Sequence, residues 1–328
     1  MAVTHGGDIF AVAHAHNWDW HDIADFSASI NPLGPAPGVK TAICQAVDRI
    51  VHYPDTESTH LRQLLAKTWN LHEDQILLGN GATDLIFFMA RILKSVTLAT
   101  PVFTEFHHAF PTADLARLDE PSTWPGSGVL VLTRPANPTG HSVHLDVIET
   151  YLKCTGATVI IDESFLEYSG LPSAATLLDR YPQLLILRSL TKFYALPGAR
   201  IGALIGRAET LRKWKAAREP WQVGVFAEAA AVAAVSDTEH AARSIAFMQT
   251  ERAWLQQQLR TGPSDANFLH VRLNYSAAAL TEHMLTRKIL IRNCADWPGL
   301  AGQSIRIAVR RRDENERLLQ AWREFECA

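Results

Sequence analysis

Residues 184–202 read Leu-Leu-Ile-Leu-Arg-Ser-Leu-Thr-Lys-Phe-Tyr-Ala-Leu-Pro-Gly-Ala-Arg-Ile-Gly and carry the pattern that decides the fold class. The segment opens as an apolar, strand-like run and closes on a turn with proline and glycine. Lys192 lies among the apolar residues Leu190, Phe193 and Leu196. A surface position is one alternative, but lysine is seldom buried without a reason. Because a desolvated lysine has a lowered pKa and becomes a usable amine nucleophile, Lys192 is a candidate for covalent chemistry.

Around this segment, short apolar runs alternate with helical patterns. The runs are rich in Val, Ile and Leu and occur at residues 76–78, 96–99, 129–132, 159–161 and 184–187. Such runs suit strands that are buried on both faces of a mainly parallel sheet. Helical patterns at 82–93 and 145–154 lie between them, and two further helices are expected before them, at 39–51 and 61–69. The alternation predicts the α/β class, with a large α/β/α domain.

The last hundred residues follow a different pattern. Helical stretches, strand-like runs and further helices are expected at 223–235, 239–259, 268–271, 277–287, 289–292, 305–309 and up to residue 325. We therefore predict a large domain at 38–215 and a smaller α+β domain at 216–328. Residues 1–37 are rich in Gly, Pro, His and Asn, so we expect them to be mostly looped and to pack on the small domain and the active site.

Composition argues against several classes of function. The 328 residues carry a formal net charge of −3, which gives no basis for nucleic-acid binding. The basic run at 310–312 is followed at once by acidic residues, which is typical of a solvated helix. The apolar run at 223–235 is too short to span a membrane, and no secretory signal is visible. The four cysteines are widely spaced without a CxxC pair, so we expect a cytoplasmic protein without a metal site.

Three further segments place polar residues where strands are expected to end. Residues 79–84 (Gly-Asn-Gly-Ala-Thr-Asp) form either a phosphate-binding helix start or a tight turn with a helix cap. Residues 137–140 (Asn-Pro-Thr-Gly) follow a strand, where α/β sheets place ligands, although alone they also fit an ordinary loop. Asp162 directly follows the strand at 159–161, so it either caps the next element or needs a cationic partner.

In this order, the four segments resemble the motifs of fold-type-I pyridoxal-phosphate (PLP) enzymes of the aminotransferase class. Within that class, the chain resembles the L-threonine-O-3-phosphate decarboxylases of cobalamin biosynthesis. The segments that carry this resemblance are residues 5–7, 25–34, 53–55, 189–198, 220–221 and 289–295. Histidinol-phosphate aminotransferases share the fold and the core motifs. They are less similar at residues 5–7 (His-Gly-Gly) and around Cys294.

The resemblance implies roles for residues that bind the cofactor ring. Lys192 would carry PLP as a Schiff base and then move protons. Asp162 would lie beside the pyridine nitrogen and keep it protonated, so that the ring can accept electrons. Asn137 would bind the phenolic oxygen. Phe103 would stack on the ring, with ordinary core packing as the alternative.

The cofactor phosphate is a dianion, and the resemblance implies several donors for it. Gly81 and Ala82 would supply backbone N–H groups at a helix start. Ser189 would add a hydroxyl and Arg200 a guanidinium. Tyr53 resembles the tyrosine that reaches this phosphate from the neighbouring subunit. The resemblance therefore implies a homodimer with shared active sites.

Other positions resemble residues that hold the substrate. Arg306 is similar to the arginine that grips the substrate carboxylate, which suits its planar guanidinium. Arg292 and His5 are candidates for the substrate's own phosphate, and Asn31 is a further candidate substrate-binding residue. The alternatives are a surface strand position for Arg292 and a terminal loop position for His5.

The reaction that the resemblance implies is PLP-dependent loss of CO₂ from L-threonine O-3-phosphate, which gives (R)-1-amino-2-propanol O-2-phosphate. The partner would be a small phosphorylated amino acid, and neither nucleic acid nor a membrane. Phe165 stands where many aminotransferases carry a tyrosine, a mild argument against ordinary transamination. The alternative is a histidinol-phosphate or other amino-acid aminotransferase. A third interpretation is a non-catalytic PLP-binding regulatory module. Such modules often carry a basic DNA-binding domain, and this sequence shows no basic domain.

Overall fold

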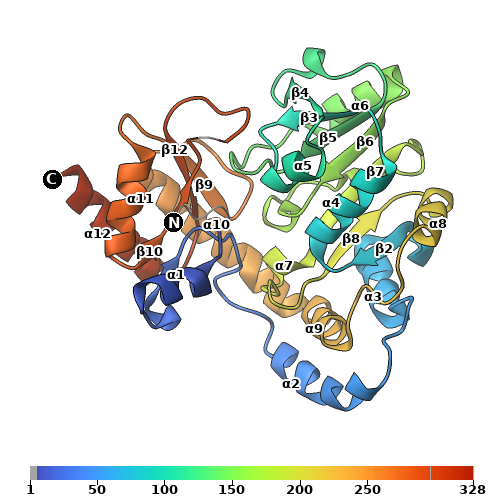
Figure 1. Cartoon of the computed structure of the whole chain (residues 1–328), viewed down its shortest axis with the longest axis horizontal. Coiled ribbons are helices and arrows are strands. Elements are labelled where there is room, and N and C mark those ends of the chain that lie inside the picture. Colours follow the sequence, from blue (N-terminus) through green and yellow to red (C-terminus); the bar gives the residue numbers. More distant parts are fainter. Residues whose placement is uncertain (1–5, 296, 328) are drawn as a thin grey trace.

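The computed structural model describes residues 6–295 and 297–327, and its central feature within them is a seven-stranded sheet. In chain order the strands are β2 (Ile76–Gly79), β3 (Val96–Thr100), β4 (Asp114–Arg117), β5 (Val129–Thr133), β6 (Thr158–Asp162), β7 (Leu184–Ser189) and β8 (Gly202–Ile205). Across the sheet their order is β2-β8-β7-β6-β5-β3-β4 (Figure 1). β8 runs antiparallel to both of its neighbours, and the other neighbouring strands are parallel.

The strands of this sheet are apolar on both faces. In β5, Leu130 and Leu132 pack on one face, while Val129 and Val131 pack on the other. The first face is covered by α6 (Leu145–Cys154). The second face is covered by α4 (Gly81–Ile92), α5 (Thr104–Ala109) and α8 (Ala208–Ala216). Burial on both sides explains the continuous Val, Ile and Leu runs, and the predicted α/β class is confirmed.

The C-terminal part adds a smaller sheet with its own helices. Its strands are β9 (Phe268–Arg272), β11 (Arg292–Asn293) and β12 (Ser304–Ala308), and β12 pairs antiparallel with the other two. Its helices are α10 (Thr238–Leu259), α11 (Ala277–Thr286) and α12 (Arg312–Glu326). Figure 1 shows α11 and α12 together at the left, with α10 reaching from this part toward the large sheet.

The N-terminal segment lies against the small sheet. β1 (Ala24–Asp25) pairs in parallel with β10 (Ile289–Leu290). Helix α1 (Ile9–His16) buries Val12 and Ala13 against Leu290. The remaining helices are α2 (Gly38–Gln45), α3 (Thr59–Trp69), α7 (Leu190–Phe193) and α9 (Val225–Ser236). Of these, α2 and α3 both contact α9.

Three elements differ from the sequence predictions. Residues 9–16 form helix α1 instead of a loop, because Ile9, Val12 and Ala13 share one face and pack on the small part. The predicted strand at 289–292 is divided between β10 and β11, since the chain changes partner from β1 to β12. The predicted helix at 39–51 ends at Gln45 and continues as a 3₁₀ helix over 46–51. The domain boundaries at 37/38 and 215/216 stay predictions.

None of the helices that the structure describes is long and apolar enough to cross a membrane. Across residues 6–295 and 297–327, no group of three or more His, Cys, Asp or Glu side chains is placed to hold a metal ion. Cys44, Cys154, Cys294 and Cys327 are all free thiols.

Candidate active site

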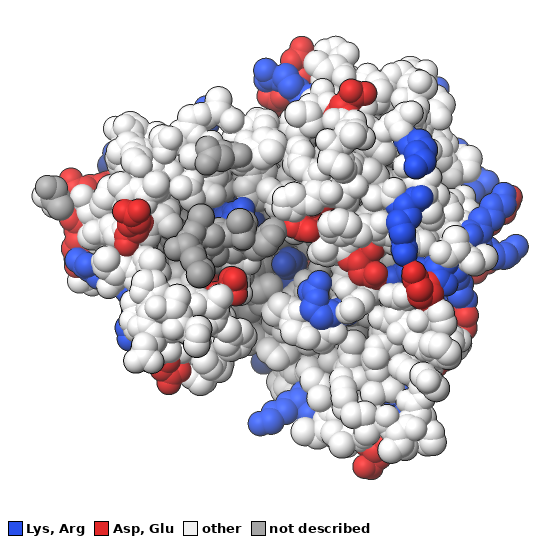
Figure 2. Space-filling model, viewed as in Figure 1, with Lys and Arg blue, Asp and Glu red and all other residues white. Residues whose placement is uncertain are grey.

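A cavity of about 340 Å³ opens where the parallel strands end. Open α/β sheets bind ligands at this edge, so the cavity is the candidate site. Figure 2 shows a hollow between the small part and the large sheet, with Lys or Arg side chains visible inside it. Nine of the residues predicted from the sequence line the cavity: Ala82, Phe103, Asn137, Asp162, Ser189, Lys192, Arg200, Arg292 and Arg306.

Lys192 reaches the cavity from the short helix α7, which follows β7 directly. Burial lowers the pKa of Lys192 from 10.5 to about 8, and the charges of Arg306 and Arg200 act in the same direction. The charge of Asp162 opposes this lowering. An amine with a pKa near 8 is partly neutral close to neutral pH, so Lys192 can act as a nucleophile.

Asp162 ends β6 and leaves only 4% of its surface exposed. Burial raises the pKa of Asp162 from 3.8 to about 6, while hydrogen bonds from Ser164 and the charge of Lys192 oppose that rise. Its Oδ1 accepts both bonds, from the Ser164 N–H at 2.9 Å and from the Ser164 hydroxyl at 2.5 Å. Asp162 therefore both caps the following turn and presents a carboxyl group to the cavity.

Hydrogen-bond donors gather at the start of α4. Gly81 has φ +84°, and a Cβ at this position would lie 2.4 Å from Nη2 of Arg200. The helix start and the guanidinium are therefore in close contact, which only glycine permits. The hydroxyls of Ser189 and Thr191 lie 2.7 Å apart and line the same cavity. Helix N–H groups, a guanidinium and two hydroxyls together form a cradle for an anion.

The turn before α4 is held by Asp84, although the helix has no side-chain cap hydrogen bond at Asn80. Asp84 Oδ2 accepts a hydrogen bond from the N–H of Asn80 at 2.9 Å. Arg218 donates to the same carboxylate oxygen. This turn and the anion cradle are therefore compatible, because Asp84 fixes the turn from outside while Ala82 and Thr83 line the cavity.

Arg306 links the small sheet to the large one. Its Nη1 donates to Oδ1 of Asn137 at 2.6 Å, and its Nη2 donates to the backbone oxygen of Ser27 at 2.5 Å. Its Nε has no hydrogen-bond partner within the described part of the chain. Burial lowers the pKa of Arg306 to about 10. The hydrogen bonds go to neutral oxygens, so the buried positive charge favours an anion in the cavity.

Arg292 lies directly opposite Arg306 in the register of β11 and β12. Both line the cavity, and the guanidinium of Arg292 lies 5.5 Å from the ring centroid of Trp297. Burial lowers the pKa of Arg292, and the charge of Arg292 contributes to the lowered pKa of Arg306. Two guanidinium groups therefore line one wall of the cavity, which suits a ligand with two negative groups.

Two phenylalanines complete the cavity. Phe103 is partly buried at the start of α5 and lines the cavity while it packs on the core. Phe165 is buried and also lines the cavity, and its ring meets that of Phe268 edge-on at 5.0 Å. Phe165 therefore bridges the two sheets and places no hydroxyl in the cavity.

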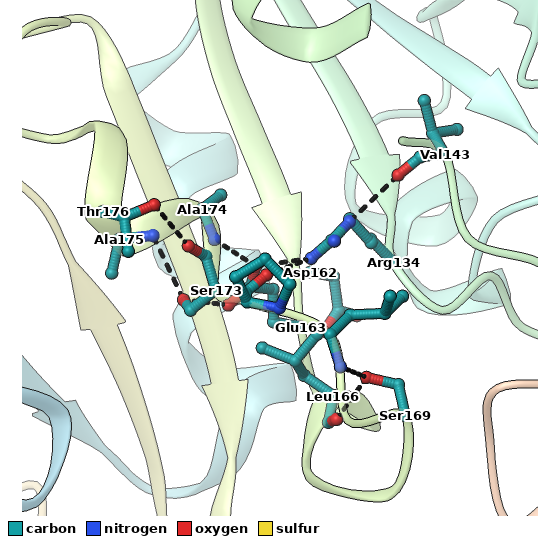
Figure 3. Close-up of polar contacts among 12 residues, drawn as sticks. Arg134, Val143, Asp162, Glu163, Leu166, Ser169, Ser173, Ala174, Ala175 and Thr176 are labelled. Atoms are coloured by element: carbon teal, nitrogen blue, oxygen red, sulfur yellow. Dashed lines mark hydrogen bonds and ion pairs between the residues drawn. The ribbon is translucent and has the colours of Figure 1, made fainter. Parts of the chain in front are cut away.

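Glu163 does not line the cavity and instead belongs to a buried polar cluster (Figure 3). It is fully buried, and its carboxylate lies 3.5 Å from Arg134 and 3.4 Å from Arg188. It also accepts hydrogen bonds from the Ser173 hydroxyl at 2.5 Å and the Ala174 N–H at 2.7 Å. Since Arg134 follows β5 and Arg188 lies in β7, one carboxylate ties together the ends of three neighbouring strands.

Two predicted residues, Asn31 and Tyr53, do not line the cavity. The side chain of Asn31 donates to the Phe193 oxygen and the Ser244 hydroxyl and accepts from the Leu33 N–H, so it supports the Lys192 segment, and its role in substrate binding stays a prediction. Tyr53 is 80% exposed and stacks on Trp221 at 4.6 Å. His5 lies outside the described residues. Gly81, a further cofactor-binding candidate, contributes through its contact with Arg200.

Among the cavity residues that were not predicted from the sequence are Ser27, Ser164, Thr191 and Trp297. Ser164 and Thr191 lie within two residues of Asp162 and Lys192. Their position beside a predicted site residue could therefore have identified them. Ser27 and Trp297 reach the cavity through the pairing of β1 with β10 and through the loop before β12. Their placement depends on contacts between distant segments, which the neighbouring residues in the sequence do not indicate.

The residues present fit PLP. A Cβ at Gly202 would lie 2.6 Å from the Ala82 nitrogen, so two glycines keep the anion cradle open to backbone approach. A buried acid and a lysine of lowered pKa line the same cavity. A phosphate cradle, an acid for the ring nitrogen and an amine for the aldehyde at the edge of a mainly parallel sheet define a fold-type-I PLP enzyme.

Comparison with known proteins agrees with that class. Residues 111–321 match the family "Aminotransferase class I and II". The threonine-phosphate decarboxylase of Salmonella typhimurium is 33% identical over 97% of this chain and 95% of its own. The histidinol-phosphate aminotransferase of Symbiobacterium thermophilum is 31% identical over 92% and 90%. The crystal structure of histidinol-phosphate aminotransferase from Clostridium acetobutylicum superimposes with a TM-score of 0.85 at 28% identity, covering 93% of this chain and 99% of that one. The chain belongs to the class I and II aminotransferase family, and its cofactor is pyridoxal 5'-phosphate.

Proposed function

We propose that this chain is a PLP-dependent decarboxylase that converts L-threonine O-3-phosphate to (R)-1-amino-2-propanol O-2-phosphate in cobalamin biosynthesis. The observation that carries the proposal is the opposed pair Arg292 and Arg306, both of which line the cavity. Threonine phosphate offers one carboxylate and one phosphate, an anion for each guanidinium. The Salmonella typhimurium relative, named threonine-phosphate decarboxylase, supports the same substrate.

The substrate carboxylate is assigned to Arg306. Its hydrogen bonds to Asn137 and Ser27 fix the plane of the guanidinium without neutralising its charge. A buried, uncompensated cation is costly, and a carboxylate that pairs with it removes that cost. A planar guanidinium binds a carboxylate through two parallel hydrogen bonds, so Arg306 also sets the orientation of the substrate.

The substrate phosphate is assigned to Arg292. The Trp297 ring beside its guanidinium stabilises the cation and limits the directions in which the side chain can turn. With one anion held by each arginine, the substrate is fixed at both ends. Decarboxylation further requires that this positioning hold the bond to the carboxylate perpendicular to the cofactor ring.

The remaining roles follow from the electrostatics of the cavity. PLP, when bound, supplies an electron-accepting ring. Asp162 holds a proton on the ring nitrogen by its negative charge. Lys192 Nζ, with its pKa lowered to about 8, releases and takes up a proton close to neutral pH. The Gly81, Ala82, Ser189 and Arg200 cradle anchors the cofactor phosphate, Asn137 binds the phenolic oxygen and Phe103 stacks on the ring.

The proposed enzyme is a homodimer. Tyr53 projects from the surface, and the neighbouring apolar residues Val47, Ile50 and Val51 are 51–77% exposed. An exposed apolar patch of this kind marks a protein interface. Tyr53 then serves the phosphate cradle of the second subunit. Light scattering of the purified protein tests the assembly, and a monomeric mass with full cofactor affinity would rule it out.

A second candidate is an aminotransferase that acts on histidinol phosphate. The Symbiobacterium thermophilum relative favours it, at 31% identity. The absence of a hydroxyl at Phe165 argues for the decarboxylase, since that position carries a tyrosine in many aminotransferases.

Incubation of the PLP-loaded protein with L-threonine O-3-phosphate separates the two candidates. We expect CO₂ release with one equivalent of aminopropanol phosphate and no requirement for a 2-oxo acid. Lys192→Ala, run in parallel, should release none. Amino transfer from histidinol phosphate to 2-oxoglutarate, without CO₂ release from threonine phosphate, refutes the decarboxylase.

A further inference from the structure

Asp162 is held by one of its two carboxylate oxygens. Oδ1 accepts from the Ser164 N–H at 2.9 Å and from the Ser164 hydroxyl at 2.5 Å. Both Asp162 and Ser164 line the cavity and are nearly buried, at 4% and 6% exposure. The contact of Asp162 with the cavity therefore depends on how Ser164 holds it.

The backbone of this turn is fixed from the other side. The Glu163 N–H donates to the Leu187 oxygen at 2.8 Å, and the Glu163 carboxylate pairs with Arg134 (Figure 3) and with Arg188. Adjacent residues at a strand end point to opposite sides. Glu163 anchors the turn in the interior, so Ser164 returns toward Asp162 with little freedom to move away.

We propose that Ser164 is a positioning residue for Asp162, whose hydroxyl fixes Oδ1 and leaves the second carboxylate oxygen for the ring nitrogen of the cofactor. The backbone N–H of Ser164 alone is enough to form the turn. The hydroxyl is a second, shorter bond to the same oxygen, and it fixes the side-chain torsion of the carboxylate. This inference rests on the proposed role of Asp162 and is independent of the substrate.

The hydroxyl also affects the charge of Asp162. Burial drives the pKa of Asp162 up to about 6, and the two bonds from Ser164 are the largest influences that oppose the rise. Without the hydroxyl, the pKa of Asp162 rises further. A larger share of the carboxyl is then neutral near pH 7, where only the ionised form pairs with a protonated ring nitrogen.

The test is the affinity of the full-length, cofactor-free protein for PLP, measured by absorbance between pH 5 and 9. Ser164→Ala should raise the dissociation constant at pH 7 about tenfold to a hundredfold, the effect of losing one hydrogen bond to a charged group. The loss of affinity on acidification should also begin at a higher pH than in the wild type. Ser164→Thr restores a hydroxyl and should restore both properties.

A double-mutant cycle separates this role from a direct contact with the cofactor. In an Asp162→Asn background, Ser164→Ala should change the dissociation constant by less than about twofold. Ser142→Ala is the matched control, because Ser142 is a buried serine outside the cavity whose hydroxyl has no partner among the described residues.

An unchanged affinity and pH profile in Ser164→Ala overturns the inference, as does an equal effect of Ser164→Ala in the Asp162→Asn background. If Ser164→Ala has no effect while Asp162→Asn weakens binding, only the role of Ser164 is wrong. If Asp162→Asn itself leaves affinity unchanged, the role proposed for Asp162 fails as well.

Discussion

Replacement of Asp162 by asparagine should stabilise the cofactor-free protein while it weakens cofactor binding. The folded-state pKa of Asp162 is raised from 3.8 to about 6, mainly by burial. A shift of about two units corresponds to about 3 kcal/mol against the ionised form. With 4% of the residue exposed, solvent screens little of this cost. Asparagine keeps the shape and still accepts the hydrogen bonds from Ser164.

The pH dependence of this difference in unfolding free energy follows from proton linkage. A raised folded-state pKa means that the folded protein binds more protons than the unfolded chain between about pH 4 and 6, so the wild type loses stability as pH rises through this window. Asp162→Asn does not titrate there. The variant should therefore match the wild type at pH 4 and exceed its unfolding free energy by about 3 kcal/mol at pH 7 to 8.

Urea denaturation of both cofactor-free proteins at four pH values measures the difference. Asp179→Asn, at an exposed position, is the control for a lost surface charge. A constant difference between the two proteins across pH 4 to 8, or a less stable variant at pH 8, would falsify the assignment of Asp162 as a strained, buried carboxylate. With PLP in excess the order of stability should reverse, because the wild type binds it more tightly.

Further predictions concern the amine of Lys192, the buried Glu163 cluster, the anion cradle at Gly81 and the substrate phosphate. Lys192→Ala should lose the yellow colour of the bound cofactor; a spectrum like that of the wild type would remove Lys192 from its role. Glu163→Gln removes the ion-pair partner of the buried Arg134 and leaves Arg188 only its 3.9 Å contact with Glu167, so urea unfolding should show a loss of about 3–5 kcal/mol. Gly81→Ala pushes a Cβ against Arg200, so fluorescence titration should show weaker binding of PLP but little change for pyridoxal, which lacks the phosphate. Arg292→Leu should raise the dissociation constant of threonine phosphate about tenfold to a hundredfold, while that of unphosphorylated threonine stays the same. An equal change for both ligands would contradict the phosphate assignment.

The sequence predicts best what depends on neighbouring residues. The apolar runs at 129–132 and 159–161 coincide with strands β5 and β6, because burial on both faces requires continuous Val, Ile and Leu. Lys192 and Asp162 are recognisable because each is a charged residue beside an apolar strand. Their meeting in one cavity follows from the parallel strands, whose carboxyl ends share an edge.

Other features depend on contacts between distant segments. Asn31 belongs to a matching motif, yet its amide is used by Phe193 and Ser244, which are far away in the sequence. The strand predicted at 289–292 is divided because β1 pairs with residues 289–290 and β12 pairs with residues 292–293. The placement of Glu163 outside the cavity requires Arg134 and Arg188 on flanking strands. These outcomes are set by packing partners and have no local signal.

Arg306 hydrogen-bonds to Asn137 and to the Ser27 backbone, and it also lines the cavity. Ligand binding is therefore coupled to the contact between the small sheet and the large one. An anion that binds this arginine should stabilise the contact between the small sheet and the large one. By the same coupling, separation of the two sheets should lower the affinity for the anion. Amide hydrogen exchange along β12 should therefore slow when inorganic phosphate or a carboxylate occupies the empty protein. Substitutions at the contact between the sheets that never touch a ligand will still appear as affinity mutants.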